Sequence, residues 1–258
     1  MAGNAALSPL DRPVPMGTLV AFVDILGFKV FSGDHQTFSR AHGMLKWFCN
    51  SIDCLCQMPA FSRLRAYQGS DCVYVRGNVP SLMLRFVRIL YQHCAANGVL
   101  LRGAMAGGNF IDLRDIADPF RPRSQAEFLP IWGDASSLAA ATEGKVKGSR
   151  FLVHGGIVLD GEPPTDLSAV VHPDLRPVPE AVAADVGPLL DFLWPRPMLP
   201  GDRQAFNGVV GGSAILEAAG ILQRLRAMLA EYQQAGDAKG QEHVQRTLDL
   251  YQRAEVNG

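Results

Sequence analysis

Residues 22–28 read Phe22-Val23-Asp24-Ile25-Leu26-Gly27-Phe28, an apolar run that predicts a β-strand ending in a carboxylate and a glycine turn. An ionised side chain is costly to bury in such a run unless a partner offsets its charge. Asp24 is therefore expected to have a cation beside it or to lie at a solvated edge. Taken as a single motif, the stretch fits an ordinary strand-to-turn aspartate as well as it fits a binding site.

Composition sets the class of protein. The 258 residues are 48% hydrophobic, enough for one core of ordinary size, or for one domain with an appended subdomain. The 24 basic and 25 acidic residues nearly cancel, so no overall charge favours nucleic acid or anionic lipid. The five cysteines sit in apolar runs, no secretion signal opens the chain, and no run is long enough to cross a bilayer. We expect a cytoplasmic protein with reduced thiols and no nucleic-acid or membrane partner.

Hydrophobic periodicity divides the chain into four parts. Residues 1–16 predict a flexible N-terminal arm. Residues 17–157 predict the order β, α, β, β, α, β, α, β, which is that of an α+β, ferredoxin-like fold: an antiparallel sheet with helices on one face. Residues 158–210 are rich in proline, which predicts a wrapping segment with little regular structure and at best a helical turn at 188–193. Residues 211–258 predict a C-terminal helical hairpin, whose apolar stripe we expect to pack within the chain rather than against a second copy.

A second carboxylate repeats the pattern of Asp24. A Gln68-Gly69-Ser70 turn between two short strand patterns predicts a β-hairpin, with Asp71 at the start of its second strand. Two aspartates on the ends of neighbouring strands can hold a pair of divalent cations. Gly27 lets backbone N–H groups approach phosphate oxygens closely. Together these features indicate a site for a nucleoside triphosphate.

With these residues the chain resembles the class III nucleotidyl cyclases. Four blocks stand in the order of that family's motifs: residues 22–28, Gly69-Ser70-Asp71-Cys72, Leu101-Arg102-Gly103-Ala104-Met105, and the Trp-Gly turn with its helix at 131–139. Four blocks in order are far more specific than one. The resemblance implies the family's fold and its reaction, which converts a nucleoside triphosphate to a 3′,5′-cyclic monophosphate and pyrophosphate at a homodimer interface.

The resemblance also implies roles for single residues. Asp24 and Asp71 would be the catalytic carboxylates and would bind two divalent cations, with the carbonyl of Ile25 as a further ligand. Manganese is the expected cation, and magnesium is the alternative. Arg102 would orient a phosphate or brace the site. The residues implied to contact the substrate are Gly27, Phe28, Tyr67 and Arg102.

Departures from the family pattern bear on the substrate. The family's adenine-reading positions hold Tyr67 and Pro130 here, and its transition-state Asn and Arg correspond to Ser137 and Ala141. An aromatic ring in place of a lysine favours a stacked or phenol-bound base, although strand packing explains Tyr67 equally well. Loss of the arginine predicts slow turnover, because charge stabilisation of the reacting phosphate is lost. Three cations follow in the sequence, and they either replace the charge of the missing arginine or form a solvated basic loop: Lys145, Lys147 and Arg150.

The chain has the family's metal-binding carboxylates but different residues at its base-reading positions. In this combination it resembles the pyrimidine cyclases of bacterial Pycsar anti-phage systems. This implies a uridylate cyclase that converts UTP to cyclic UMP as a homodimer and signals through its product to a separate effector, with CTP as the nearest other substrate. Two alternatives stay open. One is a purine cyclase with rebuilt base recognition, and the other is a catalytically silent, nucleotide-binding regulatory homologue.

Overall fold

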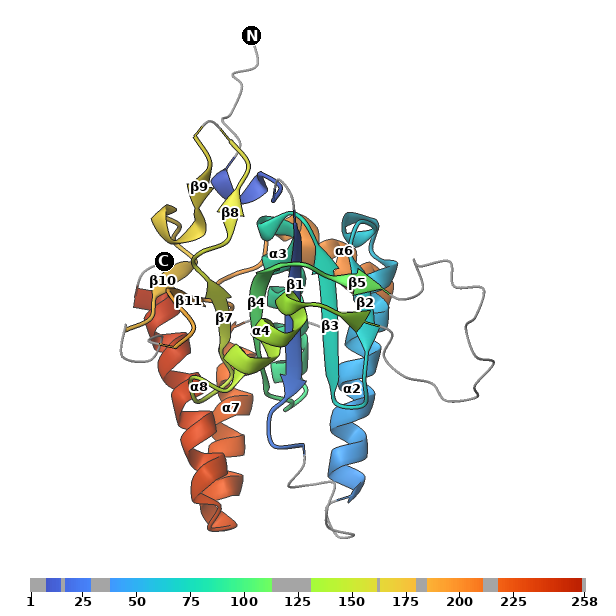
Figure 1. Ribbon diagram of the computed structural model, residues 1–258. Coiled ribbons are helices and arrows are strands. Elements are labelled where there is room, and N and C mark those ends of the chain that lie inside the picture. The colour runs from blue at the N-terminus through green and yellow to red at the C-terminus, as the bar shows by residue number, and fades with distance from the viewer. Residues whose placement is uncertain are drawn as a thin grey trace.

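The chain is built around a mixed β-sheet (Figure 1). The computed structural model describes residues 8–14, 17–28, 38–112, 131–161, 163–179, 185–210 and 218–256. Within these ranges seven strands form the sheet in the order β10-β11-β7-β4-β1-β3-β2, and neighbours are antiparallel except β4 and β7. Their bounds are β1 Thr18–Ile25, β2 Arg65–Gln68, β3 Cys72–Gly77, β4 Leu101–Gly108, β7 Phe151–His154, β10 Leu175–Pro177 and β11 Leu189–Phe192.

Strand β1 lies in the interior of the sheet, between β3 and β4. Alternate side chains of a strand point to opposite faces. One set from β1 is buried in the main apolar core: Leu19, Ala21, Val23 and Ile25. Asp24 belongs to the other set and lies at the strand's end, opposite Cys72 of β3 and Arg102 of β4. The interior position explains why an apolar run carries its carboxylate only at the end.

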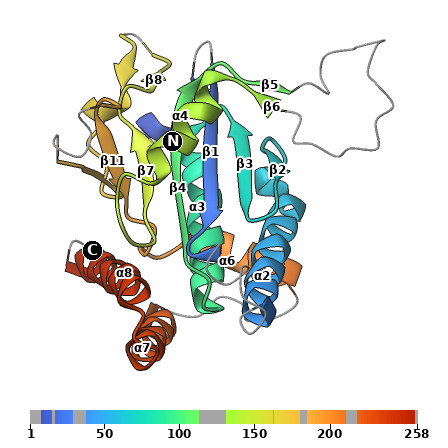
Figure 2. The ribbon, with the colours of Figure 1, turned by 60° about the horizontal axis from the view of Figure 1, so that its bottom comes forward.

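Helices lie on both faces of the sheet (Figure 2). The main core lies between one face and five helices: α2 Phe38–Gln57, α3 Pro80–Ala96, α6 Pro200–Val210, α7 Ala218–Gln234 and α8 Ala238–Val256. Helix α4, Asp134–Glu143, lies on the other face over β1 and β4. Short side chains allow this close contact, and the fully buried ones are Ala104, Ala106, Ala135 and Ala139.

Short elements complete the described structure. Three are single 3₁₀ turns: η1 Pro9–Asp11, η2 Pro59–Phe61 and η3 Leu167–Ala169. Two more are small antiparallel pairs: β5 Ile111–Asp112 with β6 Ile131–Trp132, and β8 Val158–Leu159 with β9 Thr165–Asp166.

The predicted fold class is confirmed, since the structure is α+β and its sheet is mainly antiparallel. Two details differ from the simplest form of the predicted fold. Strands β4 and β7 are parallel, and α4 covers the face opposite to the other helices. Both differences have one cause. Parallel neighbours need a crossover connection, and α4 is part of the connection from β4 to β7.

The proline-rich segment 158–210 is more regular than predicted. The helical turn expected at 188–193 is wrong, because Leu189–Phe192 is strand β11, which pairs with β7 and carries β10 on its outer side. All four residues of β11 are buried. Their apolar burial outweighs the prolines nearby, and Pro177 is tolerated because β10 is an edge strand.

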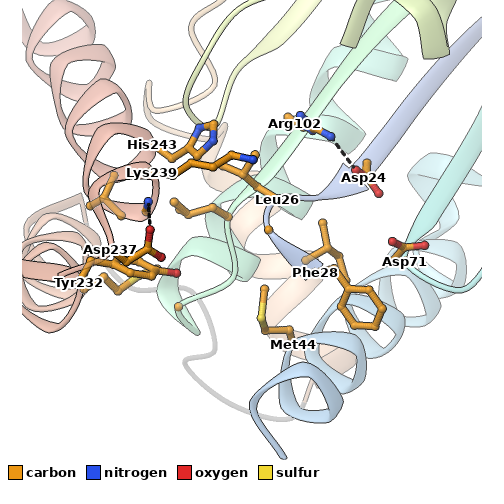
Figure 3. A pocket seen from close by; sticks show the side chains of 17 residues that line it. Asp24, Leu26, Phe28, Met44, Asp71, Arg102, Tyr232, Asp237, Lys239 and His243 are labelled. Carbon is orange, nitrogen blue, oxygen red and sulfur yellow. Dashed lines mark hydrogen bonds and ion pairs between the residues drawn. The ribbon is translucent and has the colours of Figure 1, made fainter. Parts of the chain in front are cut away.

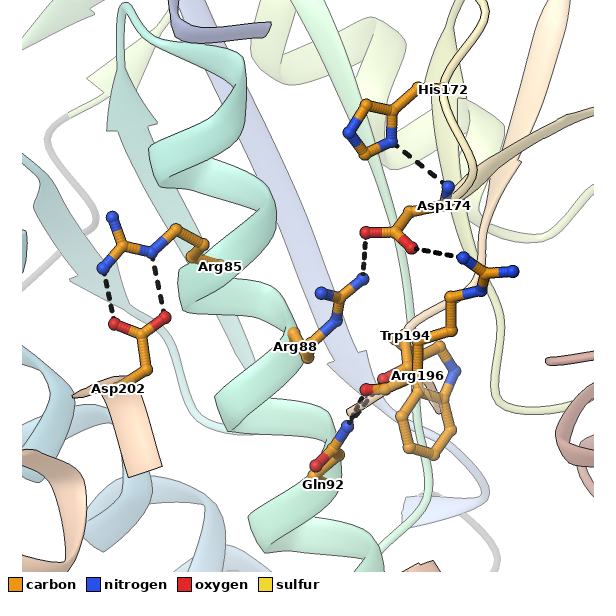
Figure 4. Close-up of polar contacts among 8 residues, drawn as sticks. All are labelled: Arg85, Arg88, Gln92, His172, Asp174, Trp194, Arg196 and Asp202. Atoms are coloured by element: carbon orange, nitrogen blue, oxygen red, sulfur yellow. Dashed lines mark hydrogen bonds and ion pairs between the residues drawn. The ribbon is translucent and has the colours of Figure 1, made fainter. Parts of the chain in front are cut away.

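Charged contacts fasten the same segment to α3 (Figure 4). Two nitrogens of Arg85 lie 2.5 and 2.9 Å from the carboxylate oxygens of Asp202. One turn of helix further on, Arg88 Nη2 lies 2.6 Å from Asp174 Oδ2. The segment therefore wraps around the helix that backs the sheet.

The two predicted C-terminal helices are present as α7 and α8. Ile221, Leu225 and Met228 of α7 are buried in the main core, which confirms that the apolar stripe packs within the chain. Tyr251 of α8 contacts Trp194 edge to face, with ring centroids 5.4 Å apart. The hairpin is therefore an integral part of the domain.

Part of the predicted N-terminal arm is also packed. Leu10 is buried in the main core, and the N–H of Val14 donates to the carbonyl of Asn78 at 2.9 Å. Residues 8–14 are thus held against the domain, while residues 1–7, 15 and 16 lie outside the described ranges. No helix in the described part of the chain is both long and apolar enough to span a membrane.

Candidate functional site

A cavity of about 260 Å³ lies at the C-terminal end of β1 (Figure 3). One wall consists of the strand end and its turn, with residues of β4 and the β2–β3 hairpin beside them. The opposite wall comes from the C-terminal hairpin of α7 and α8. Of the predicted site residues, all but Tyr67 line this cavity: Asp24, Ile25, Gly27, Phe28, Asp71 and Arg102.

The two aspartates are brought together by strand pairing. Asp24 is the partner of Cys72 in the β1–β3 register, and the N–H of Ile25 donates to the carbonyl of Asp71 at 2.9 Å. Asp71 also accepts a hydrogen bond from Ser70 Oγ at 2.8 Å. Burial and then the charges of both aspartates raise the pKa of the Cys72 thiol to about 11. The carboxylates thus form one local region of negative charge.

The turn after β1 has a conformation that requires glycine. Gly27 has a φ of 80°, in the left-handed region that side chains with a Cβ avoid. The N–H of Leu26 donates to the carbonyl of Leu100 at 2.9 Å, which fixes the start of the turn. Phe28 packs against the main core. The turn is therefore held firmly beside the carboxylates.

Arg102 links the strand end to α4. Its Nη2 lies 3.3 Å from Asp24 Oδ2, and its Nε forms an ion pair with Glu143 at the end of α4. The guanidinium thus provides the cation expected beside a half-buried Asp24. Arg102 also lines the cavity, and its predicted contact with a phosphate stays a prediction.

Tyr67 is not brought to the cavity. Its side chain is buried, with 3% of the residue exposed, and its hydroxyl donates to Asp112 Oδ2 at 2.9 Å. Its ring lies 5.4 Å from that of Phe110. Strand packing, the alternative explanation of this aromatic, accounts for what the structure shows. Pro130, the other position tied to base recognition, lies outside the described residues.

The positions of the missing transition-state residues also lie away from the cavity. Ser137 and Ala141 are exposed on α4. The three candidate compensating cations are each held by a carboxylate elsewhere: Lys145 by Asp185, Lys147 by Glu242 and Arg150 by Asp191. These ion pairs join segments of the fold, and none of the three cations lines the cavity.

The sequence analysis missed two nitrogen-bearing side chains that line the cavity. Lys239 and His243 stand one turn apart at the start of α8, on the wall opposite Asp24. Asp237 caps this helix, since its Oδ1 accepts from the N–H of Gly240 at 2.9 Å. Polar residues on an amphipathic helix usually mark a solvated face, so spacing alone gave no signal.

Comparison with known proteins does not establish a family. No family model and no curated protein matches the sequence. Among solved structures, the dimeric guanylyl cyclase domain of the RhoGC fusion protein from the fungus Blastocladiella emersonii aligns with a TM-score of 0.45 and 13% identity, over 69% of this chain and 96% of that one.

Two further solved structures align over more of this chain. A bacterial light-regulated adenylyl cyclase gives a TM-score of 0.45 at 10% identity, over 80% of this chain and 60% of that one. A class III adenylyl cyclase-like ATP-binding protein from Pseudomonas aeruginosa gives 0.33 at 9%, over 88% and 47%. Because all three TM-scores lie below 0.5, no function is transferred from these proteins.

Proposed function

We propose that the protein is a nucleotidyl cyclase, which converts a nucleoside triphosphate to its 3′,5′-cyclic monophosphate and pyrophosphate. One observation carries this proposal. Asp24 and Asp71 lie at two hydrogen-bonded strand ends beside a left-handed glycine turn, and both aspartates and the glycine line one cavity. The opposite wall of that cavity carries the ammonium of Lys239. Carboxylates facing cations are the arrangement that a metal-bound polyphosphate needs.

The donor set fits two divalent cations of the magnesium or manganese type. Carboxylate oxygens are the ligands that these hard ions prefer, and Ile25, whose carbonyl is the further ligand that the resemblance implies, lines the same cavity. Within the described residues no third His, Cys, Asp or Glu gathers with Asp24 and Asp71. Water and phosphate oxygens would therefore complete the coordination. When bound, the ions would neutralise phosphate charge and lower the pKa of the ribose hydroxyl.

The protein's own residues position the reaction. Arg102 and the strand ladder fix the Asp24 carboxylate, and the turn at Gly27 leaves room for a phosphate close to the backbone. The ribose 3′-oxygen then forms a bond to the α-phosphorus. The bond from that phosphorus to the α–β bridging oxygen breaks, pyrophosphate leaves, and the hydroxyl proton passes to solvent.

For the substrate we propose a pyrimidine triphosphate, UTP, with cyclic UMP as a messenger for a separate anti-phage effector. The support is the replacement of an adenine-reading lysine by Tyr67, whose hydroxyl is already donated to Asp112. No lysine occupies that position of the sequence to read adenine. The four triphosphates, compared as substrates, separate this preference from a purine cyclase.

We also propose a homodimer. Trp132, at the start of the α4 block, is 69% exposed, and the outer face of α4 is open at Ser137 and Ala141. A large exposed aromatic beside a short-chain surface is typical of a protein contact. Light scattering on the purified protein measures its mass, and Trp132→Ser should shift a dimer toward the monomer.

The decisive test is a product assay. Purified protein with manganese is incubated with each triphosphate, and cyclic nucleotide and pyrophosphate are measured. Asp71→Asn keeps the backbone carbonyl that binds Ile25, so the fold should persist while turnover falls by on the order of 100-fold or more. Asp53→Asn is the matched control, because Asp53 is exposed on α2 and does not line the cavity.

Absence of product from all four triphosphates would overturn the proposal. Triphosphate binding without pyrophosphate release would support the silent regulatory homologue instead. That second candidate is favoured by one observation, since α4 presents Ser137 and Ala141 where the resembled family carries its transition-state groups.

A further inference from the structure

We propose that the C-terminal hairpin of α7 and α8 provides the polyphosphate-binding wall of the cavity, through Lys239 and His243. The inference rests on the proposed function, because it assigns the anion-binding side of the same site. The ligand class is the polyphosphate group of a nucleoside triphosphate or the pyrophosphate that leaves.

The two side chains are directed at the cavity. Lys239 and His243 lie four residues apart on α8, so they share one face of the helix. Figure 3 shows them side by side, extending toward the end of β1. Lys239 is exposed, and within the described ranges it has no carboxylate at ion-pair distance. Its ammonium is therefore available to an anion.

A hydrogen bond to one ring nitrogen of His243 fixes the ring and leaves the other nitrogen able to donate. Its Nδ1 accepts a hydrogen bond from the backbone N–H of Gly148 at 3.2 Å, which places the proton of the neutral ring on Nε2. Burial, and then the charges of Lys239 and Arg102, lower the pKa of His243, so the neutral ring is favoured. A neutral imidazole with Nε2–H can donate to a phosphate oxygen.

The hairpin is anchored in a way that fixes both groups. Lys147 pairs with Glu242 at 2.7 Å, and Thr247 Oγ1 accepts from the N–H of Ser149 at 2.9 Å. On the other side of the cavity mouth, Arg40 of α2 donates to the hydroxyl of Tyr232 at 3.3 Å. These contacts hold both helices of the hairpin, and pre-organised groups lose less entropy when they bind an anion.

Charge across the cavity supports the same assignment. Asp24 and Asp71 lie on one side and the ammonium of Lys239 on the other. A metal-bound triphosphate carries its cations against carboxylates and its remaining negative oxygens outward, where a lysine stabilises them. Asp237 also lines the cavity, but its carboxylate caps the N-terminus of α8.

The test measures binding of inorganic tripolyphosphate with manganese by calorimetry, together with KM for UTP. Lys239→Met keeps the alkyl chain and should weaken tripolyphosphate binding roughly 10- to 100-fold, the loss of one charge-assisted contact. Lys239→Arg should restore most of it. His243→Asn places an amide oxygen near the position of Nδ1 for Gly148 while removing the Nε2 donor, and should weaken binding by roughly 10-fold.

The matched control is Arg226→Ala. Arg226 is an exposed cation on α7 that does not line the cavity, so its removal takes the same charge from the same hairpin. Tripolyphosphate binding should stay within about twofold of the natural protein, as for surface changes away from a site. Thermal melting of each variant confirms that the fold is retained.

Failure of this inference and failure of the proposed function give different results. If the natural protein cyclises a triphosphate but Lys239→Met and His243→Asn bind tripolyphosphate as it does, the hairpin assignment is wrong and the cyclase stands. If both variants lose binding but no triphosphate is cyclised, the hairpin assignment stands and the cyclase is wrong. An equal loss in Arg226→Ala would show that only the net charge matters, which also overturns the assignment.

Discussion

Arg150 and Asp191 form a buried ion pair that joins strand β11 to the start of β7. Arg150 Nε lies 2.8 Å from Asp191 Oδ1 and Nη2 lies 2.5 Å from Oδ2, so the pair is bidentate. The side chains are 17% and 5% exposed. The perturbation is Arg150→Met, which keeps most of the chain's apolar volume and leaves the aspartate without its principal partner.

The expected cost follows from that burial. Removing one partner of a buried pair destabilises a protein by about 3–5 kcal/mol, because a charge is left uncompensated. Arg253 also acts on Asp191 and lowers its pKa, so we expect the lower end, about 3 kcal/mol. For a chain of this length that corresponds to a fall in Tm of about 6–12 °C.

The assay is urea unfolding followed by tryptophan fluorescence, since Trp194 is fully buried and donates to the carbonyl of Ser149, beside the pair. The double variant Arg150→Met with Asp191→Leu should recover stability to within about 1 kcal/mol of the natural protein. If Arg150→Met lowered the free energy of unfolding by less than about 1 kcal/mol, the reasoning would be refuted, because exposed ion pairs contribute an amount of that size.

The pH dependence provides a second check. Burial raises the pKa of Asp191, and Arg150 opposes that rise. Without the arginine the folded-state pKa rises further above the unfolded value, so the folded state binds a proton more readily than the unfolded state does. The stability gap between variant and natural protein should therefore shrink as pH falls from 7 toward 5. KM for the triphosphate should not change, because Arg150 does not line the cavity.

Three further predictions concern single sites. Gly27→Ala should cost about 1–2 kcal/mol and raise KM, whereas Gly187→Ala, at a similar φ of 83° outside the site, should cost as much and leave KM unchanged. Glu143→Gln removes an ion pair from Arg102, which orients Asp24. Manganese binding, measured by calorimetry, should weaken roughly 10-fold, the scale for residues that orient a ligand. Burial lowers the pKa of His93 from 6.5 to about 4, so stability should be complete above pH 6.5 and decline as pH falls toward 4; His93→Gln should flatten that decline in urea unfolding.

The strand-end half of the site was predictable because its signals are local. Apolar alternation placed the strands, and the turn residues placed Asp24 and Asp71 at the ends of neighbouring ones. Strand pairing then determines which residues meet. Gly27 has a φ of 80°, so the turn requires glycine on conformational grounds, while its close approach to a phosphate stays a prediction.

The rest depended on contacts between distant segments. The partner of Tyr67 is Asp112, 45 residues away in the chain, and nothing in the pattern of the strand marks that pair. The proline-rich segment became sheet because β11 is buried against β7, a tertiary effect that overrides local breakers. Lys239 acquires its position only because α8 docks beside the loop at 147–149.

That docking gives the loop after α4 a role different from the one expected for it. Lys147 was a candidate to contact phosphate, yet it pairs with Glu242, the residue before His243. On the proposed assignment the loop contributes by holding the helix that carries the anion-binding groups. The ammonium of Lys239 would then face the substrate from α8, across the cavity from Asp24, while α4 carries no charge at Ala141. On the same assignment, Lys239 on α8 would supply the charge that α4 lacks at Ala141.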